Sequence, residues 1–272
     1  MKVWVLGSGS RGNAVLVESD DTRVLIDVGF GPRTLAARLK IAGVAPESVD
    51  ACLLTHDHSD HARGAARAAR KWGWAVFATA GTAASTDLEG AVVTTIDCGV
   101  PMLIAGLEVA AVATPHDAVE PVGFVATSTS TGARVGVCYD IGHASASVRH
   151  LCRELDILVL EANHDEAMLW AGPYPPWLCS RIACDTGHLS NRAAGALARD
   201  TVTSHTAHVV LAHLSEHNNS PEMAQRTVRS ALRGTSFRGK LTTSLQDVVA
   251  GPFVPRGMRA HSPLQYEMTF EV

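Results

Sequence analysis

Residues 56–61 read His56-Asp57-His58-Ser59-Asp60-His61 and directly follow an apolar strand predicted over Val49–Thr55. The three imidazoles and the Asp60 carboxylate are natural ligands for a divalent metal. Because side chains alternate along an extended chain, His56 and His58 can face one point. A turn into a helix predicted over Ala62–Lys71 can bring Asp60 and His61 to a second point nearby. This geometry predicts two cations that share a bridging water, lower its pKa and clamp a developing oxyanion.

Three later residues are placed like this cluster, each where an apolar strand ends. They are His116, Asp140 and His213. Any one of them alone is more often a surface or capping residue than a ligand. The alternative for the first cluster is a polar loop that is rich in histidine by chance, but such a loop would be costly to fold without a purpose. Together the residues favour a metal centre in which the two oxygens of Asp140 can bridge both metals.

The predicted elements come as runs of strands with helices between them. Two sheets with helices on their outer faces would bury such a pattern, so we predict an α/β (α+β) fold. A doubly wound parallel sheet is the competing interpretation, although it needs stricter alternation. No repeat or linker is visible, and residues 1–272 are predicted to form a single domain. The other predicted strands cover 3–6, 14–18, 23–27, 75–78, 92–96, 107–114, 123–128, 134–139, 156–161 and 209–213, and the other helices cover 32–41, 144–154, 192–200 and 221–232.

The bulk composition is that of an ordinary globular protein. Of 272 residues, 46% are hydrophobic and 18% are charged, and the net charge is -4. This charge weakens a nucleic-acid interpretation, although bound cations would add positive charge. Neither a secretory signal nor an apolar stretch of membrane length is predicted. The six cysteines form no CxxC pair, which favours reduced thiols and a cytoplasmic location.

The ligand-type residues resemble the metal-ligand series of the metallo-β-lactamase superfamily. Asp27-Val28-Gly29 also resembles the Asp-x-Gly that follows an N-terminal strand there. The resemblance implies an αββα sandwich with the site at one edge, between the sheets. The implied ligands are His56, His58 and His116 for one metal, Asp60, His61 and His213 for the other, and Asp140 as the bridge. Such a ligand set suits two divalent ions, whether Zn, Mn or Fe.

Five motifs resemble, in their order, the WalJ (YycJ) branch of that superfamily. They are residues 7–13, 55–61, 161–165, 187–191 and 212–215, and the match spans Val3 to about Leu232. The resemblance implies a metal-dependent DNA exonuclease that is connected to mismatch repair. The interval between Asp140 and His213 is too short for an inserted β-CASP domain, which argues against the RNA-processing branches. The proline-rich segment 173–179 departs from the pattern and can shape a different approach of the substrate.

His188 lies just before a predicted helix whose N-cap is Ser190 or Asn191. Because a helix N-terminus favours anions, His188 can contact a phosphate or donate a proton to the leaving oxygen. Local capping and packing is the alternative. His164 and Asp165 are candidates for support of the metal ligands or for substrate contact, and a hydrogen-bonded structural pair is the alternative there.

Three functions are compatible with these residues. The first is a phosphodiesterase that digests DNA from an end, in which a metal-bridging hydroxide attacks phosphorus, Asp60 and Asp140 fix the metal spacing and the orientation of the water, and His188 acts as the acid or phosphate contact. The second is a small-molecule hydrolase of the same fold, acting on a phosphodiester, thioester or lactone. The third, a non-catalytic metal-stabilised module, is disfavoured because the ligand series leaves room for water and substrate. A basic groove beside the metals would favour DNA, and a narrow apolar pocket would favour a small molecule.

Overall fold

A computed structural model describes residues 1–257, which contain two seven-stranded mixed sheets. The first sheet has the order β14 (Ala250–Phe253), β1 (Lys2–Gly7), β2 (Ala14–Ser19), β3 (Thr22–Ile26), β4 (Ala51–Leu53), β5 (Ala75–Ala78) and β6 (Val92–Thr95). The second has the order β13 (Lys240–Thr243), β12 (His208–Ala212), β11 (Ile157–Glu161), β10 (Arg134–Cys138), β9 (Val122–Ser128), β8 (Leu107–Ala113) and β7 (Met102–Ile104). Two separate sheets exclude the doubly wound alternative.

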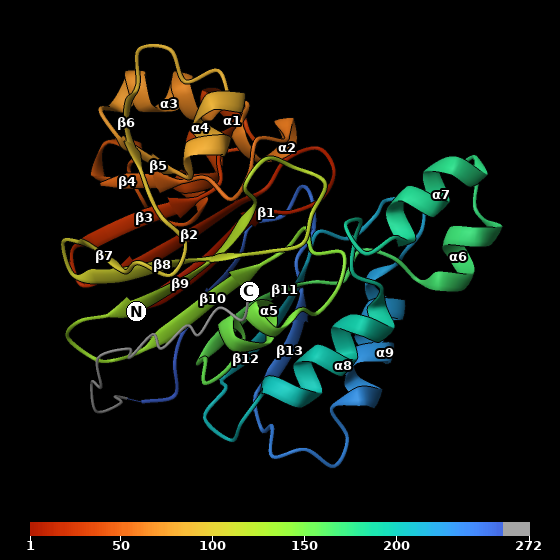
Figure 1. Cartoon of the computed structure of the whole chain (residues 1–272). Coiled ribbons are helices and arrows are strands. Elements are labelled where there is room, and N and C mark those ends of the chain that lie inside the picture. The colour runs from red at the N-terminus through yellow and green to blue at the C-terminus, as the bar shows by residue number, and fades with distance from the viewer. Residues whose placement is uncertain (258–272) are drawn as a thin grey trace.

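Helices cover the outer face of each sheet (Figure 1). The first sheet carries α1 (Pro32–Ile41), α3 (Ala65–Trp72) and α4 (Ala80–Ser85), and the second carries α5 (Ala146–Leu151), α8 (Asn191–Thr201) and α9 (Pro221–Ala231). The short α2 (Ser59–Ala62) lies at one edge, and α6 (Glu166–Ala171) and α7 (Pro176–Ala183) project from the same end of the molecule. A 3₁₀ turn spans Pro46–Ser48. The layers therefore form the αββα sandwich that the sequence predicts.

The strands of both sheets are buried on two faces. In β2, Val15 and Val17 join the core between the sheets, whereas Leu16 packs under α1. In the second sheet, Val137 faces the same inner core and Cys138 packs toward the outer helices. This two-sided burial explains why the strands read as nearly continuous apolar runs instead of alternating ones.

Parallel pairing places the candidate residues at a common edge. Strands β3 and β4 run parallel in the first sheet, and β10, β11 and β12 run parallel in the second. Side chains that follow the carboxyl ends of parallel strands meet at one edge, which is the usual place for a site in sheets of this kind. Residues at or just after these strand ends include Asp27, His56, Asp140, Glu161 and His213.

The predicted helix over residues 62–71 is wrong in its boundaries. It consists of α2 and α3, and Gly64 separates them. A Cβ at Gly64 would lie 1.9 Å from the carbonyl oxygen of Phe30, so this close approach requires glycine. Asp60 and His61 consequently lie on α2 itself, not in a turn that precedes a helix.

Other boundaries also differ from the prediction. The helix predicted over 144–154 is limited to α5, because the Ser145 hydroxyl caps its first turn. The strand β7 and the helices α4, α6 and α7 were not predicted. The C-terminal part of the described chain adds β14 to an edge of the first sheet and β13 to an edge of the second. No helix within residues 1–257 is long and apolar enough to cross a membrane.

Candidate metal centre

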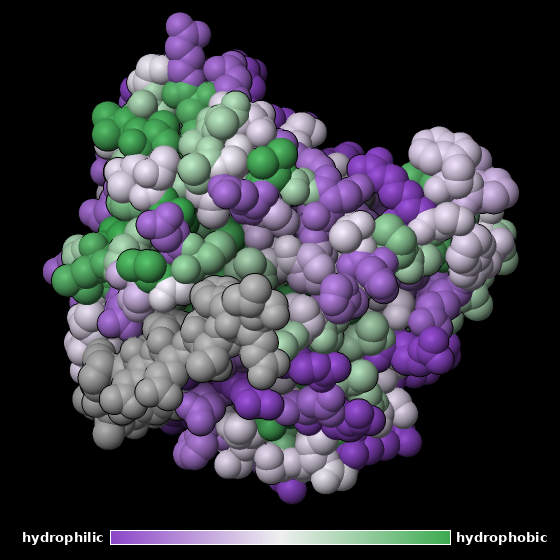
Figure 2. All heavy atoms as spheres, in the orientation of Figure 1, coloured by the Kyte–Doolittle hydropathy of each residue, from purple (hydrophilic) through white to green (hydrophobic). Residues whose placement is uncertain are grey.

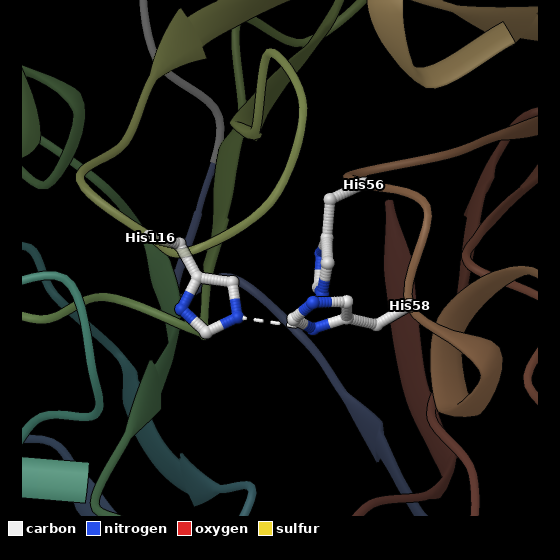
Figure 3. A group of neighbouring side chains, drawn as sticks. All are labelled: His56, His58 and His116. Carbon is white, nitrogen blue, oxygen red and sulfur yellow. Dashed lines mark hydrogen bonds between the residues drawn. The ribbon is translucent and has the colours of Figure 1, made fainter. Parts of the chain in front are cut away.

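The first group of candidate ligands is a histidine triad drawn from both sheets. His56 and His58 come from the loop after β4, and His116 comes from the loop after β8. The three rings point toward one another, with 3.2 Å between His116 Nε2 and His58 Nδ1 (Figure 3). One nitrogen of each ring lies within 4.8 Å of the others. This spacing suits three imidazoles around one cation.

In two of these rings, a hydrogen bond at Nδ1 leaves Nε2 as the nitrogen that can bind a cation. The Thr55 hydroxyl donates to Asp27, so at 3.0 Å it can only accept from His56 Nδ1–H. His56 Nε2 is then left with a lone pair, and it is buried without a hydrogen-bond partner among the described residues. His116 Nδ1 likewise faces the carbonyl of Gly187 at 3.1 Å, which leaves its Nε2 as an acceptor. Partners of this kind fix the tautomer of a metal-binding histidine.

The second group consists of Asp60, His61 and His213. Oδ2 of Asp60 lies 3.5 Å from His61 Nε2 and 3.3 Å from His213 Nε2. Nδ1 of His61 is 2.7 Å from Asp27 Oδ2, so Nε2 is again the nitrogen that remains for a ligand. The group therefore offers one carboxylate and two imidazoles to a second cation.

Asp140 lies between the two groups. Its Oδ2 is 2.5 Å from His61 Nε2 and 3.5 Å from His56 Nε2, and its Oδ1 is 2.9 Å from His213 Nδ1. Both oxygens are buried, and no donor among residues 1–257 is aimed at them with hydrogen-bond geometry. Asp140 and His213 also have φ angles of 55° and 52°, in the left-handed region that costs energy for non-glycine residues. Buried carboxylate oxygens that lie against several ring nitrogens, without a well-aligned hydrogen bond from a described residue, fit a divalent-cation centre.

The electrostatics of the centre fit the same interpretation. Burial opposes ionisation of Asp60, yet the adjacent His61 and His213 hold the pKa of its carboxyl well below the usual value. Burial also opposes the charged form of His61, but the carboxylates of Asp140, Asp27 and Asp60 raise the pKa of that imidazole. The surrounding carboxylates therefore favour a positive charge at the imidazole of His61. A bound metal would supply that charge in place of the proton.

Comparison with known proteins identifies the family. Residues 7–148 match the family described as the metallo-beta-lactamase superfamily. The chain belongs to this superfamily. This membership confirms the predicted metallo-β-lactamase fold and the predicted class of enzyme, a metal-dependent hydrolase.

Two curated relatives extend the match beyond that region. Exodeoxyribonuclease YycJ of Bacillus anthracis is 33% identical over 238 residues, which cover 86% of this chain and 89% of that protein. Exodeoxyribonuclease WalJ of Streptococcus pneumoniae is 30% identical over 238 residues, 85% of this chain and 88% of that protein. Among solved structures, the metallo-beta-lactamase fold protein YhfI of Bacillus subtilis superposes with a TM-score of 0.67 at 18% identity, over 92% of this chain and 98% of that one. The last likeness shows the fold.

The Asp-x-Gly segment of this superfamily member has a clear structural role that the sequence alone did not reveal. Asp27 accepts hydrogen bonds from the backbone N–H and the hydroxyl of Thr55, in addition to its contact with His61. A Cβ at Gly29 would lie 1.8 Å from the carbonyl oxygen of Asp60, so glycine is required for the loop to approach α2. The segment therefore orients one candidate ligand and positions the backbone of another.

Glu161 is a second residue whose role was missed, although it begins one of the recognised motifs. It is fully buried, and its Oε1 lies 2.7 Å from His188 Nδ1. Its Oε2 accepts from the backbone N–H groups of Ile141 and Leu189. Glu161 therefore ties the loop that carries Asp140 to the loop that carries His188.

His188 lies at the edge of the centre, not in a helix cap. Ser190 caps α8, which settles the choice between Ser190 and Asn191. Burial lowers the pKa of the His188 imidazole, but Glu161 and Asp140 outweigh it and raise this pKa to about 9. Since Nδ1 is held by Glu161, Nε2 is the nitrogen left for another partner. These two carboxylates therefore favour the protonated form of His188.

The other polar candidates take different places. Asp165 does not pair with His164; its carboxylate caps α6 by accepting from the N–H groups of Ala167 and Met168. His164 is buried with its Nδ1 unpartnered among the described residues.

A cleft of about 270 Å³ opens beside the centre. Its lining includes Ser10, His58, Asp60, Asp117, Asp140, Tyr174, Arg181, His188 and His213.

Proposed function

We propose that this chain is a two-metal phosphodiesterase that removes nucleotides from an end of DNA. The observation that carries the proposal is the place of Asp140 between two ligand groups, beside an open cleft whose lining residues are mostly polar. The proposed ligands are His56, His58 and His116 for one metal and Asp60, His61 and His213 for the other, with Asp140 between them. Two curated relatives that cover most of the chain are named exodeoxyribonucleases, and this supports DNA as the substrate.

The chain's own groups divide the work of phosphodiester hydrolysis. When bound, two divalent cations supply an acidified water and neutralise charge on the phosphoryl oxygens. Asp140 and Asp60 hold the spacing of the centre, and Asp27 keeps His61 in the tautomer that presents Nε2. His188, which is held by Glu161 and whose protonated form that carboxylate favours, donates a proton from Nε2 to the leaving oxygen. The proposed metals are Zn, Mn or Fe. A cytoplasmic location of the protein remains a prediction.

The first test is digestion of end-labelled linear DNA by protein that is stripped of metal and resupplied with Mn or Zn. We expect metal-restored shortening from one end, and we expect Asp60→Ala to abolish it while circular dichroism shows an unchanged fold. The Asp97→Ala variant, in which the changed carboxylate lies in the loop after β6, serves as the control. Full activity of Asp60→Ala would refute the proposal.

A small-molecule hydrolase is the second candidate, and one observation favours it. Arg181, the arginine in the lining of the cleft, is paired with Asp117 at 2.7 Å, so the cleft is not a basic groove. Metal binding without cleavage of DNA or RNA, combined with hydrolysis of a small phosphodiester, would select this function.

Replacement of His188 by glutamine tests its role as the acid. We expect a loss of about 100-fold or more in kcat on DNA, whose alkoxide leaving group needs a proton. With bis(p-nitrophenyl) phosphate we expect a loss under about threefold, since nitrophenolate leaves without protonation. Equal losses on both substrates would show instead that His188 binds the phosphate.

A further inference from the structure

The helices α6 and α7 form a small projection beside the cleft, which we call the aromatic arm (residues 165–183). Trp170 is 59% exposed and Trp177 is 68% exposed, and every other tryptophan, tyrosine and phenylalanine within residues 1–257 is buried or half-buried. By contrast, Trp4 and Trp74 are buried. The arm stands apart from the sandwich in Figure 1 and forms a pale projection on the surface in Figure 2.

The arm is held together without these two tryptophans. Leu169 and Cys179 are its buried residues, and the Cys179 thiol contacts the carbonyl oxygen of Leu169 at 3.3 Å. The Asp165 carboxylate caps α6. Each of the two indoles keeps more than half of its surface exposed after folding. Exposed aromatic side chains beside a cleft are typical of a surface that binds a ligand.

The arm borders two hollows that share one residue of the centre. Tyr174 and Arg181 line the cleft of the metal centre, and Trp170 lines a neighbouring cavity of about 430 Å³ together with His164 and Arg192. His188 lines both hollows. A DNA strand whose terminal phosphate lies at the metal centre therefore has its next nucleotides within reach of the arm.

The charges of the arm favour the faces of bases over phosphates. Its Arg181 is already paired with Asp117, and the neighbouring Arg192 is paired with Glu166 at 3.0 Å. Stacking on an indole needs no positive charge and accepts any base, because every base has a π-face. In a duplex these faces are covered by neighbouring base pairs, whereas in an unpaired strand they are accessible.

We propose that the aromatic arm binds single-stranded DNA by stacking its unpaired bases on Trp170 and Trp177, and so guides the strand into the cleft. This inference rests on the proposed function, because it assigns the strand that the same centre would cut. It predicts that loss of the two indoles weakens binding to an end with unpaired bases more than binding to a blunt duplex end.

The test compares normal and abasic strands of equal length and charge. Binding to the metal-loaded protein is measured by fluorescence anisotropy with a labelled phosphorothioate oligonucleotide, which resists cleavage. We expect the Trp170→Ala/Trp177→Ala double variant to bind the normal strand about tenfold or more weakly, the scale of lost base stacking, and to bind the abasic strand as the unmodified protein does. The Trp170→Phe/Trp177→Phe variant should retain most of the affinity. Leu103→Ala, which trims a 69% exposed side chain on β7, should change neither.

Three outcomes would overturn the inference. One is an unchanged affinity for the normal strand, and another is an equal loss for both strands. The third is a double variant that binds DNA normally but has a lower mass in sedimentation than the unmodified protein. This result would make the arm a contact between protein molecules. Hydrolysis of bis(p-nitrophenyl) phosphate and digestion of DNA by the unmodified protein are measured beside these assays. If one of the three outcomes occurs and the unmodified protein still hydrolyses both substrates, the arm inference fails while the proposed function holds. An unmodified protein that cannot digest DNA would refute the function itself.

Discussion

Replacement of Asp140 by asparagine lowers metal-dependent hydrolysis by at least about a thousandfold, because it removes the one carboxylate within residues 1–257 that contacts both ligand groups. Asparagine has the same size, so the packing around this fully buried side chain is kept. It carries one oxygen in place of two, and its amide would point an N–H group at a ring nitrogen or at a cation. The expected result is a folded protein that binds fewer metal ions and turns over little or no substrate.

The measurement combines kcat/KM on DNA with the metal content determined by elemental analysis after gel filtration. Asp200→Asn is the matched control, because it makes the same chemical change at an exposed carboxylate on α8. A protein that keeps two metals and more than a tenth of its activity would show that Asp140 is not the bridge.

Removal of the Asp27 carboxylate has the second largest effect, and it acts on stability as well as on metal affinity. Asp27→Ala leaves the N–H and hydroxyl of Thr55 and Nδ1–H of His61 without their buried acceptor. The loss of one partner from such a buried charged group costs about 3–5 kcal/mol. For a domain of this size, that corresponds to a fall in Tm of roughly 6–20 °C. The misoriented His61 should also weaken metal binding by about 10- to 100-fold.

Thermal denaturation of metal-free protein separates the two effects, and a competitive metal titration at low temperature measures the second. Asp27→Asn is the informative companion, since it keeps one acceptor oxygen and should lose less stability than the alanine variant. If Asp27→Ala binds metal as tightly as the unmodified protein, the contact between Asp27 and His61 does not support the ligand.

The sequence was sufficient for the parts of the centre that depend on strand ends. Apolar runs that stop at His116, Asp140 or His213 are visible without a structure, because a buried strand needs a continuous run and a ligand must follow it. The same reasoning located His56 and His58. The structure brings all seven candidate side chains together, and their role as ligands remains a prediction.

The residues that were missed depend on contacts between distant segments. Glu161 is the last residue of a buried strand and looks like any polar strand end, but its partners are His188 and two backbone N–H groups in other loops. The break at Gly64 depends on a close approach to Phe30, which local helix propensity cannot express. The short helices of the arm depend on Leu169 and Cys179, two small anchors that leave no clear periodic pattern.

Each candidate ligand group takes two side chains from the connection that follows β4 in the first sheet and one from a loop of the second sheet. His56 and His58 join His116, and Asp60 and His61, which lie on α2, join His213. Each half of the sandwich is one sheet with its outer helices. A cation held by either group would link the two halves at their shared edge. Neither half alone holds all three ligands of either group, so each group is complete only once the halves have docked. Release of a bound ion would require the same edge to open, and slow metal exchange becomes a property of the interface between the sheets, not of the individual ligands.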